Sequence, residues 1–238
     1  MEKTMLLFGR NLLKEALEQN LNVKKIYFQG PNDKDFVQSL LKKSSGISLS
    51  PQFPQSRLKD ASHQGVAFEL DHQFYLDELP ADFEDQFPRI LLCNHLEDVQ
   101  NLGAISRSAA AFDFGLVVHE SRRSAQLTEA AIRVSAGFAF RLKFFEVANL
   151  TPFLISLGKR GYELAGLVSG GDSLDLYEWK PQGPVALVLG AEHSGISEPV
   201  KKQLDFKLRI PMFEGVDSLN ASQAASIAIS WIYSCRSR

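Results

Sequence analysis

The sequence predicts an α/β protein: a small amino-terminal α/β domain followed by a larger α/β domain built on a mostly parallel sheet. Three observations predict this. From residue 90 onward, short apolar runs alternate with segments of helical periodicity, which is typical of parallel strands joined by helices. An acidic stretch broken by Pro80 and Pro88 separates that region from a shorter α/β pattern. The 238 residues, 45% of them hydrophobic, are enough to form a buried core. We therefore assign residues 1–72 and 89–238 to two domains and residues 73–88 to a linker.

The first domain is expected to contain helices and strands in alternation. Apolar residues at helical spacing predict helices over 11–18 and 35–42, and Asn11 is expected to cap the first of them. Short runs of strand-forming residues predict strands over 25–28 and 66–70.

In the second domain, strands are expected at 89–93, 115–119, 164–168, 185–189 and 207–210. Helices are expected at about 102–112, 126–135, 150–160, 195–203 and 220–234. Three polar segments, 94–107, 189–195 and 210–223, come directly after predicted strands. Because ligands bind beyond the carboxyl ends of the strands in such sheets, we expect the three segments to form a site there.

The first polar segment is a loop that leads into a helix. Gly103 leaves room for the close approach of a ligand or of backbone, and Arg107 shares its helix face. An arginine among small apolar residues is hard to explain by packing alone. The spacing supports two interpretations about equally: a functional Arg107, or a buried Arg107 paired with Asp98 or Glu97.

The second segment is a Gly-x-Glu-x-x-Gly turn after an entirely apolar strand. Such a turn exposes backbone amides and the carboxylate of Glu192 at the edge of the sheet. Taken alone, a tight turn with a solvated glutamate is the more common explanation of this pattern. His193 is given no role.

The third segment follows a strand that ends near Ile210, and it leads to a helix start that holds Asp217, Ser218 and Asn220. Capping needs only one of these side chains, so the others predict a further use. The helix after them is small or apolar on nearly every face, which predicts burial all round, by the core or by a second copy. We expect a homodimer through this helix.

Composition excludes some classes of function. The net charge of −2 and the pI near 6.2 are no signature of a nucleic-acid binder, so RNA binding would need a basic patch assembled by the fold. No apolar run is long enough for a membrane span, and no secretory signal is visible. Cys93 lies in an apolar run and is interpreted as a buried thiol, which favours a reducing, cytoplasmic compartment. The five histidines lack the spacing of metal ligands, and neither a Rossmann glycine motif nor a Walker motif is present.

Together and in this order, the three segments resemble the three motifs of the SpoU, or TrmH-like, RNA ribose methyltransferases over roughly residues 90–236, and Ser135-Ala136-Gly137 matches as well. Gly9-Arg10-Asn11 and His63-Gln64-Gly65-Val66 resemble the L30e-like substrate-binding domain of the rRNA-directed branch. The resemblance implies a SPOUT methyltransferase domain with a trefoil knot, S-adenosyl-L-methionine as cofactor, RNA as partner and no metal.

The resemblance also assigns residues. It implies catalytic roles for Arg107, Asn101, Glu192, Ser218 and Asn220. It implies a cofactor site on Ser169, Leu189, Gly190, Gly195, Ile210 and Leu219. Arg107 would position the ribose 2′-hydroxyl or a phosphate, or act as the base, and the other polar side chains would orient the substrate and Arg107. The chain departs from the family pattern at Asn94, often an aspartate, and at Val99, usually a proline, which leaves the loop less pre-organised.

The expected function is therefore S-adenosylmethionine-dependent 2′-O-methylation of RNA ribose, with a guanosine of 23S rRNA as the leading substrate. One alternative is a tRNA ribose methyltransferase, although those enzymes typically lack the L30e-like domain. Another is a catalytically silent RNA-binding or ribosome-assembly module of the same fold, against which the retention of all five polar residues argues.

Overall fold

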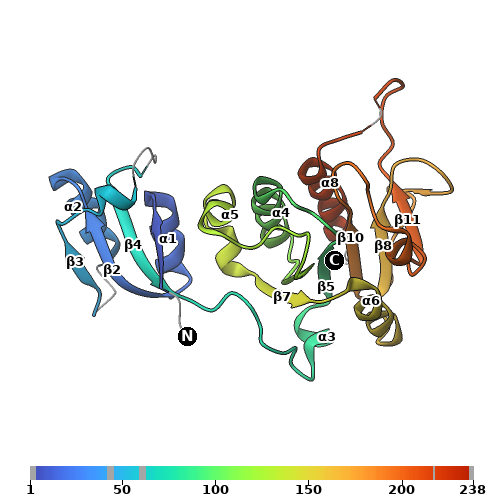
Figure 1. Cartoon of the computed structure of the whole chain (residues 1–238), viewed down its shortest axis with the longest axis horizontal. Coiled ribbons are helices and arrows are strands. Elements are labelled where there is room, and N and C mark those ends of the chain that lie inside the picture. The colour runs from blue at the N-terminus through green and yellow to red at the C-terminus, as the bar shows by residue number, and fades with distance from the viewer. Residues whose placement is uncertain (1–3, 42–45, 59–62, 217, 236–238) are drawn as a thin grey trace. The chain divides into compact units, whose positions relative to one another are not determined.

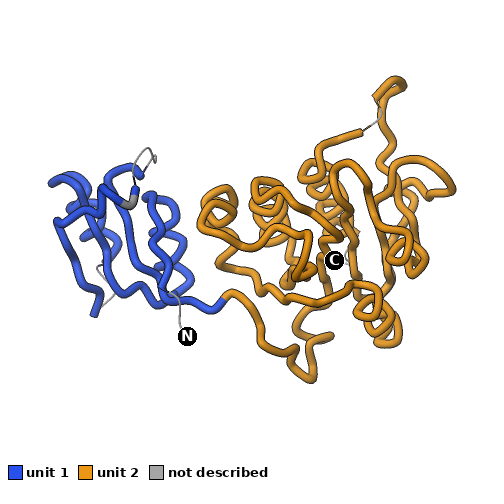
Figure 2. Tube along the Cα trace, viewed as in Figure 1, with its two compact units in different colours: residues 1–73 blue, residues 74–238 orange. Residues whose placement is uncertain are grey.

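The structure is a computed structural model that describes residues 4–41, 46–58, 63–216 and 218–235. The chain divides into two compact units, Met1–Gln73 and Phe74–Arg238 (Figure 2). Residues 74–88, expected to form a linker, belong to the second unit. Phe74 stacks on Phe140 with 6.0 Å between ring centroids, and Tyr75 forms a β-bridge with Phe144.

Unit 1 is a four-stranded sheet with two α-helices (Figure 1). Its elements are β1 (Met5–Phe8), α1 (Arg10–Glu18), β2 (Asn22–Phe28), α2 (Pro31–Leu40), β3 (Ser48–Ser50), the 3-10 helix η2 (Gln55–Arg57) and β4 (Val66–Asp71). The strand order is β1-β4-β2-β3, and only the β2–β3 pair is parallel. The predicted cap is wrong: Asn11 lies inside α1, which follows Gly9 at a φ of 111° without a side-chain cap.

Unit 2 is built on a seven-stranded parallel sheet of order β7-β6-β5-β10-β8-β11-β9. Its elements are α3 (Phe83–Gln86), β5 (Arg89–Cys93), α4 (Val99–Ala111), β6 (Leu116–Glu120), α5 (Glu129–Val134), η3 (Phe138–Arg141), β7 (Lys143–Val147), α6 (Leu150–Lys159), β8 (Glu163–Leu167), β9 (Leu174–Asp175), β10 (Val185–Leu189), α7 (Glu198–Lys201), β11 (Phe206–Arg209) and α8 (Ala221–Ser234). The predicted α/β class is confirmed, while the knot stays a prediction.

Helices cover both faces of this sheet. Leu150, Leu154 and Leu157 of α6, with Val200 of α7, pack against alternate strand residues such as Ile90 in one buried core. Helix α4 contacts α5 on one side and α8 on the other, and these three helices lie together (Figure 1). Strand β10 is buried at every residue between β5 and β8, which explains why its sequence is entirely apolar.

Helix α8 is buried on one side only within a single chain. Its buried residues are Ala225, Ala228, Ile229 and Ile232, whereas Ile227 is half-buried. The core therefore accounts for only part of its apolar character. Among the described residues, no helix is both long and apolar enough to cross a membrane.

Candidate functional site

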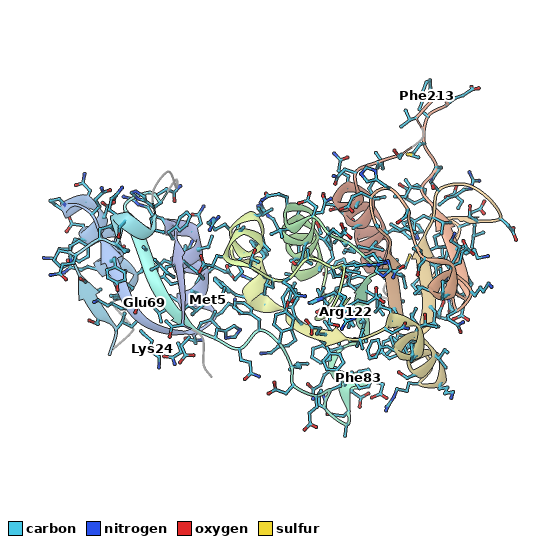
Figure 3. The ribbon with its side chains drawn as sticks, in the orientation of Figure 1. Met5, Lys24, Glu69, Phe83, Arg122 and Phe213 are labelled. Carbon is cyan, nitrogen blue, oxygen red and sulfur yellow. The ribbon has the colours of Figure 1, made fainter. Side chains whose placement is uncertain are left out.

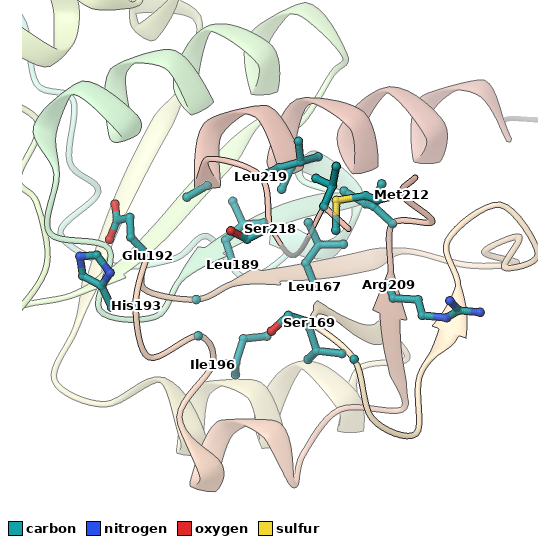
Figure 4. Close-up of a pocket in the computed structure, with 18 of the residues that line it drawn as sticks. Leu167, Ser169, Leu189, Glu192, His193, Ile196, Arg209, Met212, Ser218 and Leu219 are labelled. Carbon is teal, nitrogen blue, oxygen red and sulfur yellow. The ribbon is translucent and has the colours of Figure 1, made fainter. Parts of the chain in front are cut away.

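The loops after β8, β10 and β11 enclose a pocket of about 570 Å³ (Figure 4). It lies beyond the carboxyl ends of neighbouring parallel strands, where open α/β sheets bind their ligands. All six residues predicted to hold a cofactor line it: Ser169, Leu189, Gly190, Gly195, Ile210 and Leu219. Its size falls within the range of small-molecule and cofactor sites, which is roughly 300–1,000 Å³.

The pocket combines apolar walls with loop backbone. Apolar side chains from β8, β10 and the loop after β11 enter it, among them Leu167, Leu189 and Met212 (Figure 4). Strand-end loops supply backbone N–H and C=O groups beside these walls. Such a surface suits a flat apolar ring with polar edges, and the residues therefore fit an adenosine-containing cofactor.

The turn after β10 is closed on itself and needs glycine. Ala191 and Gly195 exchange two backbone hydrogen bonds, of 3.1 and 2.9 Å, across this turn. A Cβ on Gly190 would lie 2.2 Å from the carbonyl carbon of Gly195, and Gly195 itself has a φ of 65°. Both glycines are therefore required by the turn, which fixes the backbone that lines the pocket.

Glu192 connects the pocket to the first polar segment. Its side chain lies in the pocket lining, and its Oε1 accepts a hydrogen bond of 2.7 Å from Asn101 Nδ2. Asn101 is buried at the start of α4, so this bond fixes the direction of the carboxylate. Glu192 is exposed, as the tight-turn interpretation predicts, but the hydrogen bond to Asn101 also connects it to the first polar segment.

Asn220 and Ser218 of the third polar segment have different roles. Asn220 caps α8, because its Oδ1 accepts hydrogen bonds from the backbone N–H and the hydroxyl of Ser222, at 2.8 and 2.6 Å. Ser218 lines the pocket, whereas Asn220 is outside the lining. Asp217 falls outside the described residues. Capping therefore uses Asn220 and leaves Ser218 available to a ligand.

Arg107 is exposed and lies apart from this pocket. Its guanidinium carbon lies over the Phe138 ring, 5.7 Å from the centroid. Asp98 instead caps α4 by accepting a 2.8 Å hydrogen bond from Gln100 N, and within the described ranges Arg107 forms no ion pair. The interpretation of Arg107 as a buried, acid-paired arginine is therefore wrong.

Asn101 and Arg107 leave α4 in different directions, because six residues turn an α-helix by about 240° relative to its start. On the Arg107 side, a Cβ on Gly103 would lie 2.6 Å from the Ala131 carbonyl oxygen and 2.7 Å from Val134 Cβ. Gly103 thus serves the close packing of α5 on α4 and not the approach of a ligand. Within one chain, Asn101 contacts the pocket residue Glu192 from one face of α4, and Arg107 projects from a different face.

Asn94 joins the ends of three strands. Buried Asn94 donates a 3.1 Å hydrogen bond to Glu120 at the end of β6, and its Oδ1 accepts one of 2.8 Å from Ser197 N after β10. His95 Nε2 also lies 3.0 Å from the Glu120 carboxylate. An aspartate at position 94 would place two carboxylates together, so the departure from the family pattern matches the presence of Glu120.

Cys93 is the last residue of β5 and pairs with Leu189, which lines the pocket. Burial raises the pKa of its thiol to about 12, and the negative charge of nearby Glu192 contributes in the same direction. Both described cysteines are free. The thiol is therefore a neutral core group and not a nucleophile.

A second polar cluster joins the motif residues of unit 1. Arg10 donates a 2.7 Å hydrogen bond to Asp33 and a 3.3 Å bond to the Gln64 carbonyl, while Arg10 N donates to Gln64 Oε1. A Cβ on Gly65 would overlap the Asp33 carboxylate at 2.3 Å. The two sequence motifs of this unit, far apart in the chain, therefore meet in the structure.

Several pocket residues escaped the sequence analysis. Lys201, Arg209, Met212 and Phe213 line the pocket, and Phe213 is 86% exposed at the tip of its loop (Figure 3). The last two lie within the third polar segment, so its position after a strand could have drawn attention to them. Lys201 and Arg209 belong to a helix and a strand of ordinary charge pattern. In the part of the chain that the structure describes, no three metal-binding side chains gather.

A model of the SpoU rRNA Methylase family matches residues 88–230 of the chain. The chain belongs to the SpoU methylase family. Residues 6–76 of this SpoU methylase also match a family described as RNA 2′-O ribose methyltransferase substrate binding, and they include the Arg10–Gln64 cluster. A Staphylococcus saprophyticus protein described as a TrmH family tRNA/rRNA methyltransferase is 32% identical over 96% of this chain and 95% of its own length.

Solved structures share the fold of the SpoU methylase. The SpoU methyltransferase AviRb from Streptomyces viridochromogenes, in complex with the cofactor AdoMet, has a TM-score of 0.78 and 21% identity, covering 97% of this chain and 89% of its own. The TrmH/SpoU tRNA modifying enzyme of A. aeolicus has a TM-score of 0.58 and 23% identity, covering 63% of this chain and 76% of its own.

Proposed function

We propose that this RNA methyltransferase transfers the methyl group of S-adenosyl-L-methionine to a ribose 2′-hydroxyl of RNA, with a guanosine of 23S rRNA as the substrate. The observation that carries the proposal is the pocket, which all six expected cofactor residues line together with Glu192 and Ser218. The solved AdoMet complex of AviRb, which shares the fold, supports the choice of cofactor.

The pocket residues are suited to hold the cofactor without a metal ion. When bound, S-adenosyl-L-methionine supplies an electrophilic methyl group. The backbone around Ser169, Gly190 and Leu219 would hold it, with the apolar walls around its flat ring. Glu192, fixed by Asn101, and Ser218 would orient the ribose at the open side of the pocket.

A ribose 2′-hydroxyl is a poor nucleophile until its proton is withdrawn. Arginine keeps its proton in proteins, so we assign Arg107 to position the 2′-oxygen or an adjoining phosphate and not to remove the proton. In this reaction the 2′-oxygen forms a bond to the methyl carbon, the bond from that carbon to sulfur breaks, and the 2′-proton passes to solvent or a nearby base.

We further propose a homodimer through α8, as the sequence led us to expect. Arg107 projects from a different face of α4 than Asn101 does and does not line the pocket of its own chain. A second copy packed on the α4–α8 layer would bring Arg107 of one chain to the pocket of the other. Ile227, half-buried in one chain, would be covered by this contact.

rRNA is favoured over tRNA by the amino-terminal unit. The tRNA modifying enzyme of A. aeolicus covers 63% of this chain, whereas a structure described as an rRNA methyltransferase from Sinorhizobium meliloti covers 97%. A unit matched to a substrate-binding family therefore accompanies the methylase domain here. A tRNA ribose methyltransferase remains the second candidate. We place the reaction in the cytoplasm, a reducing compartment that suits the free cysteines.

The test uses Arg107→Ala with unmodified 23S rRNA and unmodified tRNA, both transcribed in vitro. We expect wild-type protein to methylate the rRNA at a 2′-oxygen, and the variant to lose at least a hundredfold in rate while the Kd for S-adenosyl-L-methionine changes by less than about threefold. Methylation of the tRNA alone would establish the second candidate. Absence of cofactor binding in wild-type protein would favour a silent module, and wild-type activity in the variant would contradict the role of Arg107.

A further inference from the structure

Two side chains outside the pocket, Phe138 and Arg141, lie next to Arg107 or share its aromatic contact and have no part in the chemistry assigned so far. Arg107 of α4 and Arg141 of η3 both place their guanidinium carbons over the ring of Phe138, at 5.7 and 5.1 Å from its centroid. Arg107 and Arg141 are exposed, and Phe138 is half-buried. Two cations are thus held beside one aromatic ring at the protein surface.

The turn before Phe138 is built to hold this ring in place. Ser135 is fully buried, and its hydroxyl donates to the Ile132 carbonyl at 2.7 Å and accepts from Ala139 N at 3.1 Å. Ala136 and Gly137 take left-handed backbone angles, with φ of 55° and 89°. A left-handed alanine is unfavourable, so the surrounding bonds must compensate for it. This is the Ser-Ala-Gly motif of the sequence, and it directs Phe138 toward α4.

The charges around this cluster favour an anion. Residues 104–143 hold six basic and three acidic side chains in a chain whose net charge is −2. Two of those acids already have partners: Asp113 accepts from Arg89 at 2.6 Å, and buried Glu120 accepts from Asn94. This stretch of chain is therefore locally basic, although the chain as a whole is weakly acidic.

The face of the Phe138 ring attracts each guanidinium and holds both cations at the protein surface. A phosphodiester suits this position, because the planar guanidinium fork binds two phosphate oxygens at once.

We propose that Arg107, Phe138 and Arg141 form a binding site for the phosphodiester backbone of the substrate RNA. Phe138 aligns the two guanidinium groups. Arg141 binds the RNA backbone beside the target ribose, next to the part that Arg107 binds. The inference rests on the proposed function, since it assigns the RNA that Arg107 positions to this surface. Phe138 and Arg141 are positioning residues and do not touch the reacting atoms.

The experiment measures binding of a fluorescein-labelled, mixed-sequence single-stranded RNA of about 16 nucleotides by full-length protein over a range of KCl concentrations. Arg141→Gln is expected to weaken binding about tenfold and to reduce the slope of log K against log salt by about 0.7, which corresponds to one lost phosphate contact. Arg141→Lys should keep the slope while restoring affinity only in part, because lysine retains the charge but not the fork.

The matched control is Arg160→Gln. Arg160 also lies over an aromatic ring, 5.0 Å from the centroid of Phe83, but that ring belongs to the core on the opposite face of the sheet. This variant should bind RNA with wild-type affinity and slope. Phe138→Leu, which keeps an apolar side chain, should weaken binding several-fold with little change in slope. Cofactor affinity and the melting temperature report whether each variant is folded.

An Arg141→Gln variant with the affinity and salt slope of Arg160→Gln would overturn the proposal, and so would wild-type protein that does not bind the RNA. The two proposals fail separately. If wild-type protein methylates 23S rRNA and Arg107→Ala does not, while Arg141→Gln is normal in KM and kcat, only the phosphate site is wrong. If the site binds RNA but no methyl transfer to rRNA or tRNA occurs, the proposed function is wrong.

Discussion

Asn101 fixes the Glu192 carboxylate through a hydrogen bond of 2.7 Å, so the acidic side chain of the pocket has a defined direction. Two further asparagines of the polar segments, Asn220 and Asn94, also hold loops in place. Asn220 holds the start of α8 and leaves Ser218 in the pocket lining. The side-chain amide of Asn94 forms hydrogen bonds to both the Glu120 carboxylate and the loop after β10. Some polar side chains of the three segments therefore support the loops, and others face the pocket.

Cys93 provides a prediction on pH dependence. Its pKa rises from 9.0 to about 12 on folding, so between these values the folded state holds a proton that the unfolded state releases. The stabilising effect is complete below about pH 9 and is lost as the pH rises toward 12. From pH 8 to pH 10.5, the thiol should lower the free energy of unfolding by about 2 kcal/mol.

The measurement is urea unfolding at both pH values for wild-type protein and Cys93→Ala. The variant should be less stable at pH 8, because a buried side chain is shortened, but its free energy of unfolding should fall less on going to pH 10.5. Tyr75, whose pKa burial raises to about 12, is present in both proteins, and the charge of Cys93 makes only a minor contribution to that pKa. An identical loss in the two proteins would contradict the burial of this thiol.

At the level of elements, α4 carries the largest departure from the family pattern and gives the second prediction. Val99 is its first helical residue, and Asp98 before it has the extended backbone that a following proline requires, with φ −80° and ψ 116°. A backbone N–H at this helix position has no partner within the helix. Val99→Pro should therefore be accepted and raise the free energy of unfolding by about 0.4–1 kcal/mol.

Val99→Ala is the control, because it removes the valine side chain without adding the ring. In chemical denaturation, Val99→Pro should have a higher free energy of unfolding than both wild-type protein and Val99→Ala. A proline variant that is less stable than the alanine variant would mean that the start of α4 differs from the structure.

Elements with a strong local pattern could be predicted from the sequence. Strands β5 and β10 have the predicted bounds because each is a short apolar run with polar loops at its ends. Strands β1, β3, β7 and β9 were not predicted. β7, Lys143–Val147, mixes charged and aromatic residues at the sheet edge, and β9 has two residues. β1 has four residues and β3 has three, and both form only by pairing with strands distant in the sequence.

The site was predictable to a similar extent. The cofactor residues came from the resemblance and from the position of loops after strands, and the structure brings them into one lining. Phe138 and Arg141 could not be found in this way. The contact of Phe138 with Arg107 joins residues more than thirty positions apart, and no spacing in the sequence indicates such a contact.

For the molecule as a whole, the association of two copies is the third prediction. Sedimentation equilibrium should give a mass of about twice the 26.5 kDa of one chain. Ile227→Glu should give the mass of a single chain, because a charge on this half-buried residue of α8 would be desolvated by the contact.

Ser234→Glu is the matched control at an exposed position of the same helix. It should leave the mass unchanged. A wild-type protein that sediments as a single chain, or an Ile227→Glu variant that still sediments as a dimer, would contradict an α8 interface.

The strand order of unit 2 also has a consequence for synthesis on the ribosome. β5 pairs with β6 and with β10, and β10 ends only at Leu189. While the chain is being made, one edge of β5 and one edge of β8 stay unpaired until β10 has been synthesised. Other chains could pair with these apolar edges. Unit 1 has all its strands by Asp71 and can close its sheet earlier. The amino-terminal unit can therefore complete its sheet while apolar strand edges of the methylase sheet are still unpaired.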